Sequence, residues 1–115
     1  MSRRTEVCFL IGADGEVLWS ERSGSSAAMP DSRARWEAIW AHRDELAVIA
    51  HSHPNGPAAF SAEDESTMAA IDAALGGALR YAVVTPEGIT YRGPGGVDAV
   101  EPEWAARLRD ESGMV

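Results

Sequence analysis

Two histidines and an aspartate have the types and spacing of a metal site. His51 and His53 directly follow the apolar run 46–50, so we expect them at the end of a buried strand. Side chains alternate along a strand, which places positions i and i+2 on the same side. Asp64 follows in the first turn of a predicted helix. Two imidazoles and a carboxylate with an open fourth position form a recurrent catalytic zinc arrangement, so the pattern predicts a Zn²⁺ centre.

Hydrolysis at such a centre also needs a base that is not a metal ligand. Glu6 is the candidate, because it opens the first predicted strand, and pairing of that strand beside 46–50 would bring its carboxylate to the metal-bound water. Ser61, three residues before Asp64, is expected to donate its hydroxyl to the oxyanion that develops at the scissile carbonyl. The predicted catalytic pair is therefore Glu6 and Ser61.

Each of these residues also has a purely structural interpretation. Ser61 and Asp64 fit a capping box, which any helix can use. A glutamate at a strand start is most often solvated, and a His-x-His pair alone does not establish a metal. It is the combination of Glu6 with the three candidate ligands that favours a catalytic centre.

Three other kinds of residue are assigned no chemistry. Cys8 lies within an apolar strand and is expected to be a small buried thiol. His42 lies beside charged residues on a predicted helix and is expected at the surface. The four tryptophans are expected to be core or half-buried anchors, namely Trp19, Trp36, Trp40 and Trp104.

The elements that must position the site alternate between strands and helices. Residues 6–11 and 17–19 predict a hairpin around Gly-Ala-Asp-Gly, while 22–32 stays open between a loop and a weak edge strand. A helix is expected from Pro30 or Asp31 onward, capped by Asp31 or Ser32. Its inner face is predicted to carry one stripe of side chains, namely Trp36, Ile39, Trp40 and Arg43.

The second half of the chain continues this alternation. A strand over 46–50 is followed by a helix over 61–75, with Met68, Ile71 and Leu75 inward and Gly76 and Gly77 at its end. Residues 79–84 and 89–91 predict a second hairpin, and 102–110 a last helix with Pro102 in its first turn. The sum is an α/β domain with a mixed central sheet covered by helices.

Length and charge narrow the function class. A chain of 115 residues suits one domain, so we expect a single domain over 1–115. The net charge of −8 disfavours nucleic acid as a partner. One cysteine excludes an internal disulfide, and no apolar run is long enough for a bilayer, so a soluble, cytoplasmic protein without a membrane partner is expected.

The same residues resemble a known family signature. His51-Ser-His-Pro54, seven residues counted from Pro54 to Phe60, then Ser61-x-x-Asp64 with Glu6 upstream, is similar to the JAMM (MPN+, JAB) metalloprotease motif. Glu6-Val-Cys8-Phe-Leu-Ile-Gly12 also matches the form in which the family's glutamate commonly occurs. The resemblance implies zinc ligation by the two histidines and the aspartate, acid/base catalysis by Glu6, and stabilisation of the tetrahedral intermediate by Ser61.

The resemblance covers roughly residues 6–91 and implies a cytidine-deaminase-like α/β/α sandwich. It also implies a zinc isopeptidase that cleaves the amide bond after the C-terminal glycine of a ubiquitin-like or sulfur-carrier protein. A RadC-like protein and a non-catalytic metal-binding interaction module are the alternatives.

Two departures from the family pattern matter. Five residues precede Glu6, so a helix common in relatives is expected to be missing, and a homodimer or another partner would cover that face. The 44 residues between Glu6 and His51 leave little room for the insertions that give linkage selectivity.

Overall fold

The residues that the structure describes fold into a five-stranded sheet with three helices. A computed structural model describes residues 4–22, 33–95 and 100–114. In chain order the elements are β1 (Val7–Gly12), β2 (Val17–Arg22), α1 (Arg33–Ala41), β3 (Leu46–Ser52), α2 (Ala62–Leu75), β4 (Arg80–Val84), β5 (Ile89–Arg92) and α3 (Glu103–Glu111). No helix within these described residues is long and apolar enough to span a membrane.

The strands form one mixed sheet in the order β2-β1-β3-β4-β5. Hairpins join β1 to β2 and β4 to β5 in antiparallel pairs, whereas β3 and β4 run parallel and are connected through α2. The two predicted hairpins and the predicted strand over 46–50 are therefore confirmed, and this strand lies in the middle of the sheet. Because β1 pairs directly with β3, with Cys8 opposite His51, the start of β1 lies beside the end of β3.

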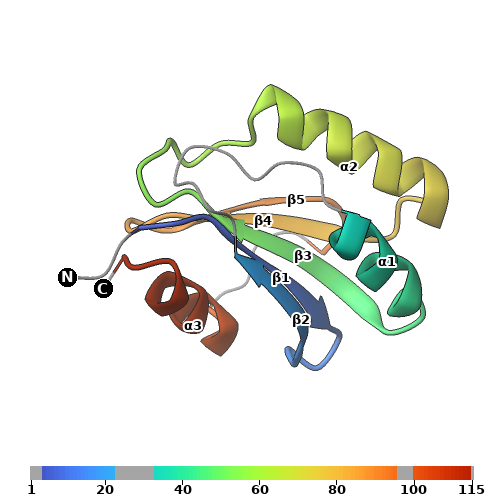
Figure 1. Cartoon of the computed structure of the whole chain (residues 1–115), viewed down its shortest axis with the longest axis horizontal. Coiled ribbons are helices and arrows are strands. Elements are labelled where there is room, and N and C mark those ends of the chain that lie inside the picture. Colours follow the sequence, from blue (N-terminus) through green and yellow to red (C-terminus); the bar gives the residue numbers. More distant parts are fainter. Residues whose placement is uncertain (1–3, 23–32, 96–99, 115) are drawn as a thin grey trace.

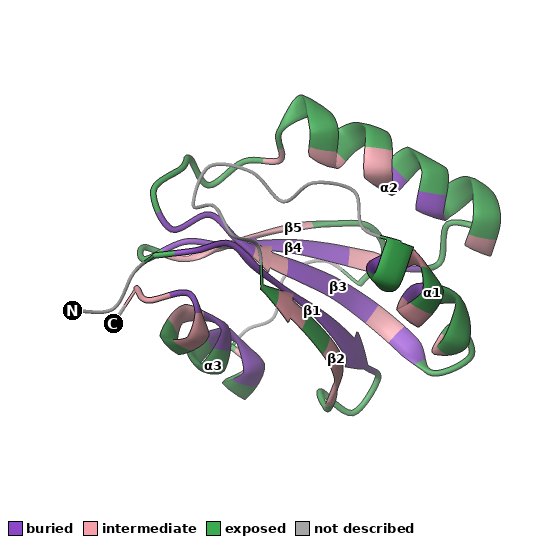
Figure 2. Ribbon diagram, in the orientation of Figure 1, coloured by how far each residue is buried: buried purple, intermediate pink, exposed green. Residues whose placement is uncertain are grey.

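Helices cover both faces of the sheet (Figure 1). On one face, residues of α1 and α2, including Ile39, Met68 and Ile71, pack against Leu10 and Ile49. Trp104, Ala105 and Leu108 of α3 pack on the opposite face. The middle strands are consequently buried along most of their length, as Figure 2 shows. The predicted α/β class, with its α/β/α layering and mixed sheet, is confirmed.

Helix α3 provides cover for the sheet from within the chain. Its buried side chains contact a cluster that includes Phe9, Ala50 and Val84. Pro102 takes the N-cap position rather than the first turn, since the helix begins one residue later than predicted. Association with a second copy or another partner stays a prediction.

Helix α1 is oriented differently from the sequence prediction. Arg35 and Ile39 are its buried residues, whereas Trp40 is 56% exposed and Arg43 is exposed as well. The guanidinium of Arg43 lies 4.2 Å from the centre of the Trp40 ring, so the two side chains stack on the surface. The expected inner stripe through Trp40 and Arg43 was wrong, because neighbours in a helix are rotated by about 100° and Ile39 takes the inward position. The predicted caps and most of 22–32 lie outside the described residues.

Candidate metal centre

The two histidines stand at the carboxyl end of the central strand. His51 is the penultimate residue of β3, and His53 follows immediately after the strand. The backbone N–H of His53 still donates to the carbonyl of Val84 on β4 at 2.9 Å, which extends the strand direction past its formal end. Both rings therefore project to one side, as the i, i+2 spacing predicted.

The aspartate is placed by the N-terminus of α2. Ser61 is the N-cap residue, and its hydroxyl oxygen accepts a hydrogen bond from the backbone N–H of Asp64 at 3.1 Å. In return, the Asp64 carboxylate oxygen Oδ2 accepts the Ser61 backbone N–H at 2.8 Å. This reciprocal capping box fixes where the helix starts and how the Asp64 side chain turns. Gly76, with φ +88°, provides the left-handed C-cap that ends the helix.

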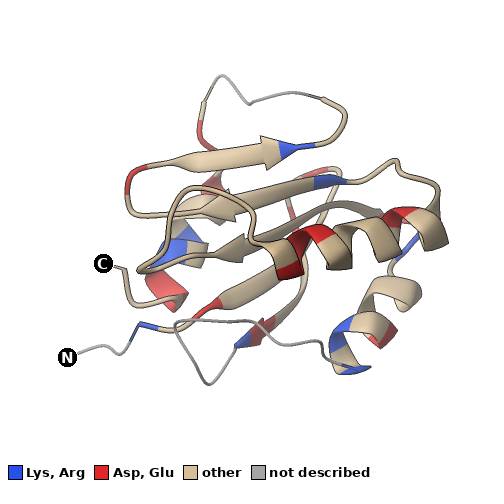
Figure 3. Ribbon diagram, turned by 90° about the horizontal axis from the view of Figure 1, so that it is seen from above, with Lys and Arg blue, Asp and Glu red and all other residues tan. Residues whose placement is uncertain are grey.

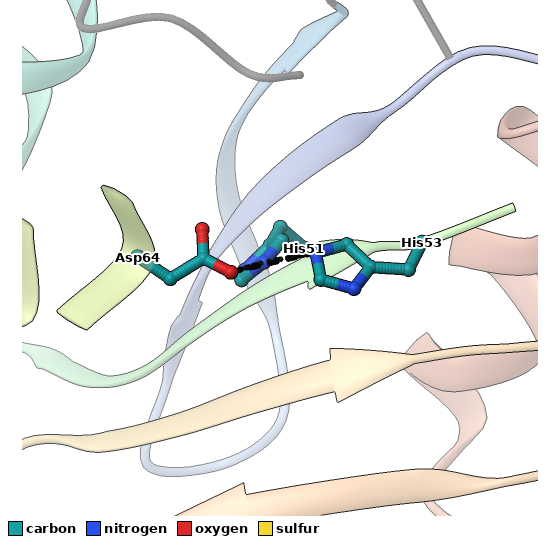
Figure 4. Close-up of side chains that lie close together, drawn as sticks. All are labelled: His51, His53 and Asp64. Carbon is teal, nitrogen blue, oxygen red and sulfur yellow. Dashed lines mark hydrogen bonds and ion pairs between the residues drawn. The ribbon is translucent and has the colours of Figure 1, made fainter. Parts of the chain in front are cut away.

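The three side chains meet at one point (Figure 4). Nε2 of His51 lies 3.1 Å from Nε2 of His53 and 3.2 Å from Oδ2 of Asp64, while the distance from His53 Nε2 to the same oxygen is 3.4 Å. Three atoms that each offer a lone pair thus face one another at close range. Such atoms repel unless a proton or a cation lies between them. These residues therefore form a group that could hold a metal ion.

The tautomer of His53 is set by its other ring nitrogen. Nδ1 of His53 lies 3.1 Å from the carbonyl oxygen of Pro57, which can only accept a hydrogen bond. In the neutral ring Nδ1 therefore carries the hydrogen, and Nε2 keeps its lone pair for a cation. A backbone carbonyl in this position is one of the groups that commonly orient a metal-binding histidine.

Hydrogen bonds among the candidate ligands shift the pKa values of His53 and Asp64 in opposite directions. The hydrogen bond with Asp64 raises the pKa of His53 above its ordinary value, against the opposing effect of burial. Burial alone would raise the pKa of Asp64, but the hydrogen bonds from His51 and His53 outweigh it and hold that pKa well below its usual range. Asp64 is therefore a carboxylate at neutral pH, the form that binds a cation.

Glu6 lies immediately before β1 and is 5% exposed, so it is not the solvated residue that its position alone would suggest. Burial raises the pKa of Glu6 to about 7; the ring of His53 opposes this shift, and the carboxylates of Asp64 and Glu63 add to it. Glu6 thus lies within electrostatic reach of two of the three candidate ligands. The sequence prediction placed its carboxylate beside this centre. In the structure the charge of Glu6 interacts with His53 and Asp64, and no direct hydrogen bond joins it to the three candidate ligands among the described residues.

Several contacts that the sequence did not predict hold the N-terminal segment, residues 4–6, against the candidate metal centre. The buried hydroxyl of Ser52, between the two histidines, accepts the backbone N–H of Val7 at 2.8 Å. Arg4 donates to the carbonyl of Pro54 and to Oδ1 of Asn55, both at 3.0 Å. The strand period offered a signal for Ser52, because the residue between two same-side histidines must point to the other face, where only a hydrogen-bonded polar group is tolerated.

Ser61 is exposed and acts as the helix cap in this structure. A hydroxyl that accepts a hydrogen bond can still donate its own hydrogen, so capping leaves the predicted donor role open. Cys8 is 2% exposed, and burial raises the pKa of its thiol to about 12, which agrees with a structural thiol. His42 contacts Glu45 in the segment after α1 and is not part of the candidate ligand group.

The fold and the site together define an α/β protein with a His–His–Asp candidate metal centre. Residues 4–92 match the family model described as prokaryotic homologs of the JAB domain. The match spans more than half of the chain, and the protein belongs to this family. A comparison with curated proteins found no matching sequence.

Proposed function

We propose that this protein is a zinc-dependent peptidase or isopeptidase that cleaves the amide bond after the C-terminal glycine of a ubiquitin-like or sulfur-carrier protein. The observation that carries the proposal is the convergence of two imidazole nitrogens and one carboxylate oxygen within 3.1–3.4 Å of one another. Membership of the JAB family supports a metal-dependent hydrolase.

The donor set fits zinc in particular. Zinc–nitrogen bonds of about 2.0–2.1 Å in a tetrahedron imply ligand atoms about 3.3 Å apart. The observed separations of 3.1, 3.2 and 3.4 Å lie around that value, so His51, His53 and Asp64 would hold the ion as three protein ligands. Three ligands leave a fourth position, as in catalytic rather than structural zinc sites.

A bound zinc ion would supply Lewis acidity, which acidifies a water molecule and polarises the scissile carbonyl. Glu6 takes the proton of that water on its carboxylate and returns it to the leaving amine nitrogen. Its burial and its proximity to His53 support this role. The exposed hydroxyl of Ser61, held by the capping box, donates to the oxyanion that develops on the carbonyl oxygen.

The test uses fusions in which the C-terminal glycine of a ubiquitin-like or sulfur-carrier protein is amide-linked to a reporter. Zinc-loaded protein is expected to release the reporter, and a chelator should stop the release. Glu6→Gln should lower turnover by about 10²–10⁴-fold while zinc stays bound. Glu16→Gln changes an exposed glutamate in the β1–β2 turn and should leave the rate unchanged.

A wild-type protein that binds zinc but cleaves none of these fusions would contradict the proposal and favour the non-catalytic interaction module. Salt-sensitive DNA binding by the same preparation would instead favour the RadC-like alternative.

A further inference from the structure

A cavity of about 290 Å³ opens beside the candidate metal centre. It lies between the sheet and the two helices α1 and α2, which share one face of the sheet (Figure 1). His51 and Asp64 belong both to its wall and to the candidate ligand set. A molecule held at the centre is therefore in direct reach of this cavity.

Much of the cavity wall is apolar, and its aliphatic side chains are buried in the core. Ile39 comes from α1, Ile49 from β3, and Met68 and Ile71 from α2, and each of these four side chains is buried. Phe60 adds an aromatic ring whose centre lies 6.2 Å from that of His51.

Two of the polar groups in the wall are either already hydrogen-bonded or uncharged. The hydroxyl of Tyr81 donates to Oδ1 of Asp72 at 2.7 Å, so its ring is what the cavity meets. The thiol of Cys8 stays neutral, because burial raises its pKa to about 12. Arg35 lines the end contributed by α1, and Glu63, Ser66 and Thr67 lie along α2 toward the centre.

We propose that this cavity binds an apolar group of the substrate that lies directly beside the scissile amide. The inference rests on the proposed function, since it places the amide at the metal centre. Protein interiors are close-packed, so a space of this size that joins a candidate centre is best explained as a ligand site. Its volume is near the lower end of small-molecule pockets, which suits one aliphatic or aromatic side chain rather than a folded surface.

The position of the group on the substrate follows from the proposed cleavage point. Glycine has no side chain, so a scissile bond after glycine leaves the acyl side with nothing to fill the cavity. The apolar group then belongs to the amine side of the bond. The favoured leaving group is an amine that carries an aliphatic or aromatic chain.

Two hydroxamates of different size test the inference through binding to the zinc-loaded protein, measured by calorimetry. Acetohydroxamate reaches only the metal, whereas benzohydroxamate adds a ring that the cavity can bury. Because each buried methylene-sized unit adds about fourfold in affinity, we expect benzohydroxamate to bind at least tenfold more tightly. Its binding should also shift the methyl NMR signals of Met68 and Ile71.

A pair of tryptophan variants on α2 provides the matched control. Thr67→Trp places a ring into the cavity from a half-buried position, and Ala70→Trp adds the same ring at an exposed position outside it. Thr67→Trp should abolish the tenfold gain and keep the affinity for acetohydroxamate, while Ala70→Trp should change neither.

Equal affinities of the two hydroxamates for the wild type, or unshifted Met68 and Ile71 methyl signals, would overturn the inference. A zinc-loaded protein that binds neither hydroxamate would instead contradict the proposed catalytic centre, and with it the basis of the cavity assignment. Thermal unfolding curves of both variants identify any loss of folding, and the wild-type NMR result holds independently of the variants.

Discussion

The hydroxyl oxygen of Ser52 accepts a 2.8 Å hydrogen bond from the backbone N–H of Val7, and both residues are buried. Ser52 lies between the two candidate histidine ligands, and Val7 follows Glu6. One hydrogen bond therefore joins the segment that would hold the metal to the segment that would supply the acid/base. This hydrogen bond lies on the opposite side of β3 from the candidate ligands. It holds the segment that carries Glu6 at a fixed position relative to the candidate metal centre.

Ser52→Ala is expected to lower the free energy of unfolding by about 1–3 kcal/mol, because it leaves the buried N–H of Val7 without an acceptor. Urea unfolding measures the change. Ser112→Ala is the matched control: the hydroxyl oxygen of Ser112 is equally buried but has no hydrogen-bond partner among the residues that the structure describes. It should be neutral or stabilising, and an equal loss in both variants would show that packing, not the hydrogen bond, matters.

Metal content should depend on Asp64 and not on its neighbour in the same helical turn. The wild type is expected to bind about one zinc ion per chain, measured by elemental analysis after desalting. Asp64→Asn should lose the ion and yet change stability by less than about 1 kcal/mol, since the amide oxygen can still accept the Ser61 N–H. Figure 3 shows that acidic residues crowd the start of α2, and Glu63→Gln is therefore the control. Loss of zinc from both variants would indicate diffuse acidic binding.

The stability of the metal-free protein should fall as pH rises from about 4.5 to about 7. The pKa of Glu6 is raised from 4.5 to about 7 in the folded state, so folding favours its protonated form and this contribution is lost through that window. The expected loss is about 1–3 kcal/mol. Glu6→Gln should flatten part of the slope; the rest belongs to His53, whose raised pKa acts in the same direction. Urea unfolding at several pH values, with chelator present, measures the slope, and an unchanged slope in Glu6→Gln would refute the assignment.

Two tryptophans of the helices, Trp40 of α1 and Trp104 of α3, should respond very differently to truncation. Trp104→Ala removes a buried anchor of α3 and is expected to cost about 3–5 kcal/mol. Trp40→Ala removes an exposed ring and its contact with Arg43, and should cost less than about 1 kcal/mol. Thermal or urea unfolding of the two variants checks this, and similar losses would mean that Trp40 packs inside after all.

The sequence predicted those parts of the site that follow from local rules of backbone structure. The i, i+2 histidines at the end of an apolar strand, and an aspartate at the third position of a capped helix, follow from backbone periodicity and capping alone. Glycine at the end of α2 and the two hairpins follow from turn chemistry in the same way.

The parts that the sequence did not predict depend on tertiary contacts. Arg35 is buried although arginine is rarely found inside, so no pattern rule would have chosen it over Trp40 as an inward residue of α1. The raised pKa of Glu6 arises from burial by elements remote in sequence. The cavity exists only because α1 and α2 pack over the sheet on the same side, a spacing that no local motif encodes.

The residue just ahead of Glu6 is fastened to the end of α3. The backbone N–H of Thr5 donates to the carbonyl of Ser112 at 3.1 Å, and Arg22 bridges the Thr5 hydroxyl and the Glu111 carbonyl. A shift of this helix end would therefore move Glu6, the proposed acid/base, through a single peptide unit. An antibody or a fused module that binds the end of α3 is therefore expected to slow the proposed turnover from a distance, while the candidate metal ligands stay unchanged.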